Sequence, residues 1–297
     1  MINFWPGLLG AFLLLGVPVQ AQPLDPGILQ GTIVSPSSQQ KQDARSVLRR
    51  LAQAQVVYLA ETHDRAADHQ AQLAMIQALH RLRPNLSIAL EMFQQPYQSV
   101  LDRYLAGQLS ETQLQDQSQY AKRWGFPWEF YAPILRYAKA NHLPVIALNL
   151  PSEITRKVAR QGLDSLSSVE QQSLPPAAEI ELGPDAYRDR LQQLHQEIHQ
   201  GSGNSNNFDR FFLVQVLWDE TMAARIARAV KQDPDRLVVV LVGQGHVAYG
   251  DGIPNRVSRR LQSQLNQPFQ QFSVLLNPSP EQSQQGPAIA DYVWSYP

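Results

Sequence analysis

A short apolar strand that ends in four polar residues is the feature that most constrains this chain. Residues 56–60 are β-branched, aromatic or apolar, and residues 61–64 are polar. A long amphipathic pattern begins at Ala66, as expected for a strand that feeds a crossover helix. Because ligands bind beyond the carboxyl ends of the strands in an open parallel sheet, Glu61 and His63 are predicted to lie at a functional site.

The same pattern, an apolar run followed by a polar residue, recurs along the chain. We predict strands at 86–90, 144–148 and 237–242, which are followed by Glu91, by Asn149, and by Gly243-Gln244-Gly245-His246. Further strands are predicted at 272–276 and 292–296, with helical periodicity between the strands. The predicted fold is α/β, a three-layer sandwich around a mostly parallel sheet. If the strands are parallel neighbours, their polar ends share one edge of the sheet.

The domain organisation follows from three changes in composition. Residues 152–207 contain no convincing strand, so we predict a helical cap inserted into a single domain that spans 41–297. Residues 22–40 are rich in Pro, Gln and Ser and are predicted to be an irregular lead-in. Residues 1–21 carry an apolar run too short to span a bilayer and are typical of a cleaved signal peptide. We therefore expect an exported, periplasmic or envelope-associated protein, with an uncleaved amino-terminal anchor as the alternative.

Charge and cysteine content exclude several classes of site. A formal net charge of -1 and the lack of a basic run argue against nucleic-acid binding. The chain has 0 Cys, so any metal or haem site must use His, Tyr, Met, Asp or Glu.

Two kinds of chemistry fit the polar residues at the strand ends. His63, Glu91 and His246 are suitable ligands for a divalent metal. The same residues together with Glu61 could instead act as a metal-free general acid and base. Structural roles are the alternative for each residue alone, since a carboxylate at a strand end often caps the next helix.

Other residues are predicted to support this site. Asp219 lies in the apolar face of a helix predicted at 208–231 and is expected to orient a site histidine. His69 is expected to turn toward the same edge of the sheet. Tyr249 and Arg256 are expected to contact a ligand, with Arg256 binding an anionic group. Three further histidines are predicted to lie on the surface: His142, His195 and His199.

Several motifs, in a fixed order from about Leu51 to Leu261, together resemble a known family. They are Ala60-Glu61-Thr62-His63-Asp64 with His69-Gln70, Glu91-Met92-Phe93, Trp128 to Tyr131 with Pro133, Ala147-Leu148-Asn149-Leu150-Pro151, Trp218 to Ala223, and Gly243-Gln244-Gly245-His246 with Gly252-Ile253-Pro254 and Arg256. This set is similar to the ChaN-like haem-binding uptake family of the Tiki and erythromycin-esterase-like superfamily. The resemblance implies an exported α/β protein that binds haem and acts in haem or iron uptake or handling.

The same resemblance leaves an enzymatic alternative open. The wider superfamily includes proteins that look like metal-dependent hydrolases, with paired Gly-x-x-His motifs and a glutamate. Here these would correspond to Ala60 to His63, Gly243 to His246, and Glu91, although Ala60 replaces the first glycine. Whether the chain is an enzyme is thus left undecided. A homodimer that shares haem and a peripheral association with a membrane are further alternatives.

Haem iron in a chain without cysteine would be bound by Tyr, His or Met. The tyrosines predicted as candidates are Tyr249, Tyr131 and Tyr97. Aromatic walls for the haem are expected from Phe93, Trp124, Phe126 and Trp128.

Overall fold

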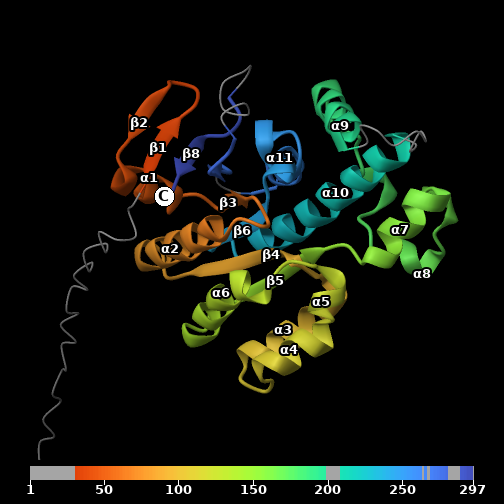
Figure 1. The fold of residues 1–297 in the computed structure, drawn as a ribbon, viewed down its shortest axis with the longest axis horizontal. Coiled ribbons are helices and arrows are strands. Elements are labelled where there is room, and N and C mark those ends of the chain that lie inside the picture. Colours follow the sequence, from red (N-terminus) through yellow and green to blue (C-terminus); the bar gives the residue numbers. More distant parts are fainter. Residues whose placement is uncertain (1–30, 199–207, 263, 266–267, 280–287, 297) are drawn as a thin grey trace, which may run out of the picture.

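The computed structural model describes residues 31–198, 208–262, 264–265, 268–279 and 288–296. At its centre is an eight-stranded sheet with the strand order β2-β1-β8-β7-β3-β6-β4-β5 (Figure 1). The strands are β1 (Thr32–Ser35), β2 (Gln40–Gln42), β3 (Val56–Glu61), β4 (Leu86–Gln94), β5 (Val145–Asn149), β6 (Leu237–Gly243), β7 (Gln271–Leu276) and β8 (Tyr292–Ser295).

The sheet is parallel from β8 across to β5. Only β1 departs from this direction, since it pairs antiparallel with both β8 and β2. The predicted mostly parallel sheet is therefore confirmed. The strands β3, β6, β4 and β5 are consecutive neighbours, so their carboxyl ends lie along one edge.

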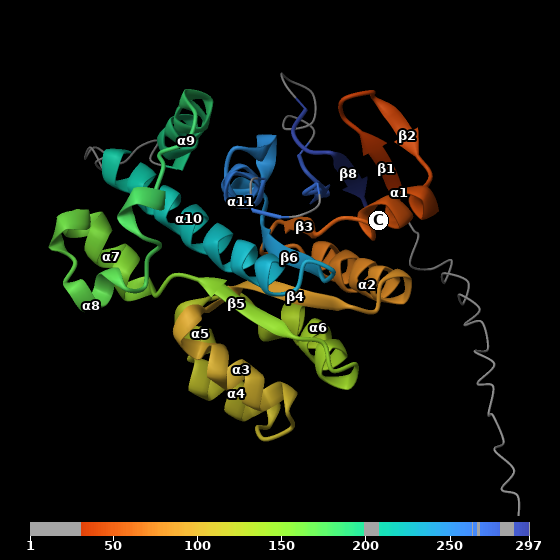
Figure 2. The same cartoon turned by 180° about the vertical axis from the view of Figure 1, so that it is seen from behind.

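Successive side chains of each strand point to opposite faces, and both faces of the sheet are covered. Val57 and Leu59 of β3 join a core with α1 (Ala44–Leu51), α2 (Ala66–Leu82) and α3 (Gln98–Leu105). The same layer contains α4 (Glu111–Ser118), α5 (Tyr120–Arg123) and α6 (Trp128–Ala140). Val56, Tyr58 and Ala60 pack instead against α10 (Phe208–Gln232) and α11 (Ile253–Leu261). Figures 1 and 2 show these two helical layers on either side of the sheet.

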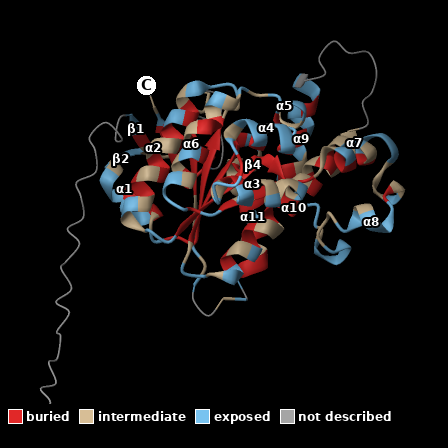
Figure 3. Cartoon of the chain, turned by 90° about the horizontal axis from the view of Figure 1, so that it is seen from below, coloured by how far each residue is buried: buried red, intermediate tan, exposed pale blue. Residues whose placement is uncertain are grey.

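Burial follows the three-layer order. The central strands are buried along their whole length, and the helices around them are exposed on their outer sides (Figure 3). Each large apolar side chain moved out of water stabilises the fold by roughly 1.5–3 kcal/mol. This explains why β3 and β6 contain long β-branched and aliphatic runs rather than an alternating pattern.

The described part of the segment predicted to be a cap is helical and lies beside α10. It contains α7 (Ser152–Gln161), α8 (Ser168–Gln171) and α9 (Asp185–Ile198), joined by short 3-10 turns. Leu150, Ile154 and Val158 pack against Leu217 of α10. A second contact of the cap uses Tyr187 and Leu191 of α9, which pack on Phe212 and Val216 of α10.

Two boundaries differ from the sequence predictions. The lead-in predicted as irregular contains β1, and its last residue begins β2, because Thr32-Ile33-Val34 pairs with β8. The strand predicted at 86–90 continues to Gln94, with an irregularity in its pairing to β5 after Leu90. Glu91 is therefore part of β4 and does not follow it.

The predicted signal peptide lies outside the described residues. In the part of the chain that is described, no helix combines the length and the apolar character that crossing a membrane requires.

Candidate functional site

Four polar residues converge at the carboxyl ends of β3, β4 and β6, as predicted. His246 Nε2 lies 3.5 Å from Glu91 Oε1, and the Gly243 N–H donates to Glu91 Oε2 at 2.7 Å. The His63 imidazole lies directly over Gly243, and Glu61 contacts His63. We call Glu61, His63, Glu91 and His246 the rim. Asn149 makes a local contact instead, because its Oδ1 accepts from the N–H of Leu150 at 2.8 Å.

Glu61 is the buried anion of the β3 side. Its Oε1 accepts from the Tyr131 hydroxyl at 2.7 Å and lies 3.0 Å from His63 Nδ1. Its Oε2 lies 3.0 Å from His69 Nδ1. Burial alone would raise the pKa of Glu61, but the hydrogen bonds with His63 and His69 outweigh it and lower the pKa to about 2. Glu61 is therefore ionised at neutral pH.

His69 is surrounded by hydrogen-bond acceptors. Its Nε2 lies 3.0 Å from the carbonyl oxygen of His63, and its Nδ1 faces Glu61 Oε2. The Gln72 Nε2 group donates to the carbonyl of Leu59 at 2.9 Å, so Gln72 presents Oε1 to His69 Nδ1 at 3.3 Å. Burial opposes a charged His69, but the contact with Glu61 raises its pKa. His69 thus stabilises the charged carboxylate of Glu61 from a buried position and does not face solvent.

His63 is the partly exposed histidine of the rim, with 27% of its side chain accessible. Trp124 and Phe126 lie against it, with ring centroids at 4.8 and 5.0 Å. These are two of the four predicted aromatic walls. Phe93 is buried in the core, and Trp128 donates its indole N–H to Glu111 at 2.7 Å. Phe93 and Trp128 therefore have packing roles here.

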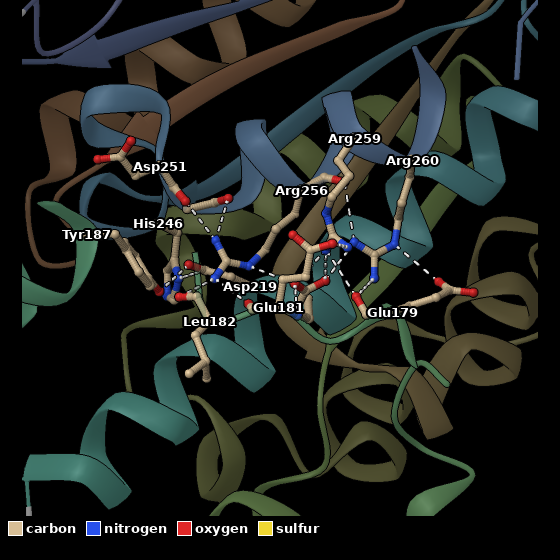
Figure 4. A network of polar contacts seen from close by, with 12 residues as sticks. Glu179, Glu181, Leu182, Tyr187, Asp219, His246, Asp251, Arg256, Arg259 and Arg260 are labelled. Atoms are coloured by element: carbon tan, nitrogen blue, oxygen red, sulfur yellow. Dashed lines mark hydrogen bonds and ion pairs between the residues drawn. The ribbon is translucent and has the colours of Figure 1, made fainter. Parts of the chain in front are cut away.

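The β6 side of the rim is held by a chain of three side chains (Figure 4). Asp219 Oδ1 lies 2.5 Å from His246 Nδ1, and Asp219 Oδ2 accepts from the Tyr187 hydroxyl at 2.6 Å. Asp219 thus holds a site histidine, as predicted from its place in the apolar face of α10. Burial opposes the charged form of His246, but Asp219 and Glu91 raise its pKa to about 10.

Tyr187 was not predicted as a site residue. It comes from α9 of the cap, and nothing in its local sequence marks it, because its role depends on how the cap folds back over α10. Gln72 and Asp68 were also missed. Asp68 accepts from the Thr62 N–H at 2.8 Å and from the Asn277 side chain at 2.7 Å, which fixes the turn that carries His63.

Two glycines allow the close approach of the rim histidines. A β-carbon on Gly243 would lie 2.8 Å from His63 Cε1 and 2.9 Å from its Nε2. A β-carbon on Gly252 would lie 2.3 Å from the carbonyl oxygen of His246 and 2.9 Å from Asp219 Oδ2. Ala60 lies 0% exposed in the layer of α10, so its methyl group packs in the core.

Arg256, expected to contact an anionic ligand, is instead buried, and its guanidinium contacts groups of the protein itself (Figure 4). Its Nη1 donates to the carbonyls of Asp251 and Gly252 at 2.7 and 3.0 Å. Its Nη2 donates to the carbonyl of Glu181 at 3.3 Å, and its Nε lies 3.3 Å from Glu220 Oε1. The structure therefore uses Arg256 to fasten the cap to α10 and α11.

Tyr249 lies one turn after His246 in an unusual conformation. Its φ of 62° is in the left-handed region, which is uncommon for a residue other than glycine. Its N–H donates to the carbonyl of Ile289 at 2.7 Å, and Arg190 lies 4.4 Å from the centre of its ring. The side chain is half-buried, and no described residue forms a hydrogen bond with its hydroxyl.

A family model described as haem-binding uptake, Tiki superfamily, ChaN, matches residues 47–257. The chain belongs to this family. A curated relative, RETICULATA-RELATED 5, chloroplastic, of Arabidopsis thaliana, is 26% identical over 272 residues, a match that covers 85% of this chain and 35% of the relative. The chain thus spans about a third of the relative's length. The solved structure of ChaN of Campylobacter jejuni, described with cofacial haem binding, has a TM-score of 0.71 at 18% identity. It covers 90% of this chain and 97% of that one, and it shows the shared fold.

The metal site predicted for this ChaN family member gains no support from the structure. Within the described ranges, no group of three or more histidine or acidic residues is arranged to hold a metal ion. Glu91 accepts from the N–H of Gly243, and Asp219 engages His246 Nδ1. A metal at His63, Glu91 and His246, and the hydrolase that would use it, remain hypotheses from the sequence.

The prediction that three histidines lie on the surface is confirmed for only one of them. His142 is exposed, and His199 lies outside the described residues. His195 is instead buried, with its ring 5.0 Å from Phe211 and 5.6 Å from Phe208. The reason is that His195 shares a face of α9 with Leu191, four residues earlier, and this face packs on α10.

Proposed function

We propose that this protein binds haem and takes part in haem or iron uptake or handling. The family membership supports this proposal, since ChaN of Campylobacter jejuni is described with haem bound. Haem would supply a ferric iron and a large apolar ring.

Tyr249 is the residue proposed to bind the haem iron, and the observation that carries the proposal is that its hydroxyl forms no hydrogen bond with a described residue. Tyr131 is a poor alternative because it donates to Glu61, and because burial and then the charge of Glu61 raise its pKa well above the usual range. Tyr97 lies beneath the guanidinium of Arg123, at 4.9 Å from ring centre to cation. The backbone strain at Tyr249 is of the kind that concentrates at functional sites.

The rim supplies polar surroundings but is a poor source of iron ligands. His246 favours its protonated form at neutral pH, and an imidazolium has no lone pair for a metal. The half-buried rings of Trp124 and Phe126 beside His63 offer apolar contacts of the kind that a porphyrin ring needs. Residues of the rim would therefore orient and enclose the haem.

Titration of the mature chain with haemin tests this proposal. We expect a Soret shift at micromolar haemin for the natural chain, a binding constant weakened at least tenfold in Tyr249→Phe, and a changed Soret maximum. Tyr97→Phe is the matched control and should bind as the natural chain does. No Soret shift in the natural chain, or identical spectra for all three proteins, would refute the assignment. Sedimentation of the same samples measures whether one or two subunits hold the haem.

We also propose that the protein is exported, on the basis of the apolar run before Gln22. Mass spectrometry of the chain recovered from a secretion-competent bacterial host should show an amino terminus at Gln22. A chain recovered from the cytoplasm that still begins at Met1 would contradict this prediction.

A further inference from the structure

A cavity lies on the side of α10 that faces away from the rim. Its volume is about 480 Å³, and it is formed by the second half of α10, the turn after β4 and the cap segment 172–179. Thr221 lines this cavity and Asp219 faces the rim. Because Thr221 and Asp219 are two residues apart on an α-helix, their side chains project in directions about 200° apart around the helix axis. The cavity and the rim therefore use different faces of the same helix.

The lining of this cavity is strongly positive. Its charged members are Arg225, Arg228, Lys231, Arg260 and Glu179. Arg260 is neutralised, since its Nη1 lies 2.6 Å from Glu220 Oε2. Arg225, Arg228 and Lys231 form no ion pair with any described residue. Three cations thus face one cavity, and the Glu179 carboxylate that also lines it lies 3.5 Å from Arg260 Nε instead of pairing with them.

Arg225 is the most confined of these cations. Its Nε donates to the carbonyl of Ala147 at 3.2 Å, and its Nη2 donates to Gln98 Oε1 at 3.1 Å. Both partners are uncharged, and the side chain is half-buried. Burial and the like charge of Arg228 disfavour the charged form of Arg225 and lower its pKa, and the opposite charge of Asp102 offsets this penalty only in part. An anion in the cavity would remove this penalty.

The buried hydroxyl of Thr221, a lining residue that is 1% exposed, has no hydrogen-bond partner among the described residues. Buried polar groups are nearly always hydrogen-bonded, and an exception often marks a group that a ligand or ion satisfies. The apolar part of the lining comes from Leu174, Pro175 and Pro176 of the cap.

We propose that this cavity binds a small phosphorylated organic molecule, at a site separate from the haem site. Guanidinium groups bind phosphate through two parallel hydrogen bonds, and a phosphate has enough oxygens to contact several cations at once. Arg225, Arg228 and Lys231 would neutralise the phosphate, and the Thr221 hydroxyl would donate to it. The volume is within the range of small-molecule sites, and the proline-rich wall would contact the organic part.

Calorimetric titration of the full chain with inorganic pyrophosphate tests the charge requirement. We expect binding by the natural chain and at least a tenfold loss in the double variant Arg228→Glu/Lys231→Glu. The control is Lys41→Glu/Arg45→Glu, which makes the same change in net charge at exposed positions of the opposite helical layer and the edge hairpin. Equal losses in both double variants would show a general charge effect and would overturn the proposal. Citrate that binds as tightly as pyrophosphate would overturn the assignment to a phosphate.

Thr221→Val separates a ligand contact from a structural role. Without ligand, this variant should unfold at the same temperature as the natural chain or higher, because an unpartnered hydroxyl is removed. Its affinity for pyrophosphate should fall about fivefold, the loss expected for one hydrogen bond. Unchanged affinity would contradict the proposed contact. Haemin titration of Arg228→Glu/Lys231→Glu should match the natural chain, and loss of haem binding there would refute a separate site.

Discussion

Single atoms decide how closely the rim histidines approach the sheet. Gly243 lies under His63. The β-carbon of any other residue at this position would lie closer to the imidazole than the normal contact distance. A β-carbon on Gly245, two residues later, would have no other atom of the described residues within 4 Å. The motif around His246 therefore contains one glycine required by packing and one that packing does not require.

Gly243→Ala should displace His63 and destabilise the fold by about 1–3 kcal/mol, the usual effect of overpacking a tight site. Gly245→Ala is the matched control and should change the free energy of unfolding by less than about 0.5 kcal/mol. Chemical denaturation measures both values, and the imidazole NMR signals of His63 report its displacement. Equal stability of the two variants would show that the neighbourhood of Gly243 adapts.

At the scale of elements, the cap is fastened to α10 and α11 by a buried network of charges. Glu220 is 0% exposed and accepts from Arg259 Nη2 at 2.7 Å and from Arg260 Nη1 at 2.6 Å, and Arg256 also contacts it. The guanidinium of Arg256 also lies 4.9 Å from the ring centre of Tyr187. The same network therefore places Tyr187 against Asp219, so cap attachment and the position of His246 are connected.

Arg256→Met should loosen the cap, because it removes the donors to Glu181 and leaves the Glu220 charge with fewer partners. We expect a loss of about 3 kcal/mol in the free energy of unfolding and faster proteolysis within the cap. Arg136→Met is the control, since Arg136 lies outside the cap and pairs with Glu111 at the surface, where an ion pair contributes about 0–1 kcal/mol. Similar proteolysis rates for the two variants would argue against a fastening role.

At the scale of the molecule, the sandwich holds a buried cluster of ionised groups whose stability depends on pH. His246 has a folded-state pKa raised to about 10, above the ~6.5 of an unfolded chain. Its contribution is fully present below about pH 6.5 and is lost as the pH rises through 10. Glu61 behaves in the opposite way, because its pKa is lowered to about 2. Its contribution is present above about pH 4.3 and is lost as the pH falls through 2.

We therefore expect the free energy of unfolding of the natural chain to decrease between pH 7 and pH 10 more than that of His246→Gln. The upper bound is about 1.4 kcal/mol for each pH unit between the folded and unfolded pKa values of His246. Urea denaturation at several pH values measures the difference. Parallel pH profiles for the two proteins would show that His246 is not held as an imidazolium.

Much of this architecture was predictable because its causes are local. The runs 56–60 and 237–242 are too apolar to lie anywhere but in a buried sheet, and the polar residue after each run marks the end of a strand. Asp219 was identified by its place in an apolar helical face, since a buried acid needs a partner. Strand β1 was missed because its short β-branched run is surrounded by Pro, Gln and Ser, and its pairing with β8 joins opposite ends of the chain.

The sequence by itself determined the α/β class, the polar strand ends and the family, because periodicity and ordered motifs are properties of the chain read in one dimension. Only the tertiary structure decided that Tyr187 reaches Asp219, that Arg256 is buried in the cap and that Thr221 faces a cationic cavity. Each of these contacts joins segments that no local pattern relates. They depend on how the cap folds back over α10, where burial and charge pairing are settled by neighbours distant in the sequence.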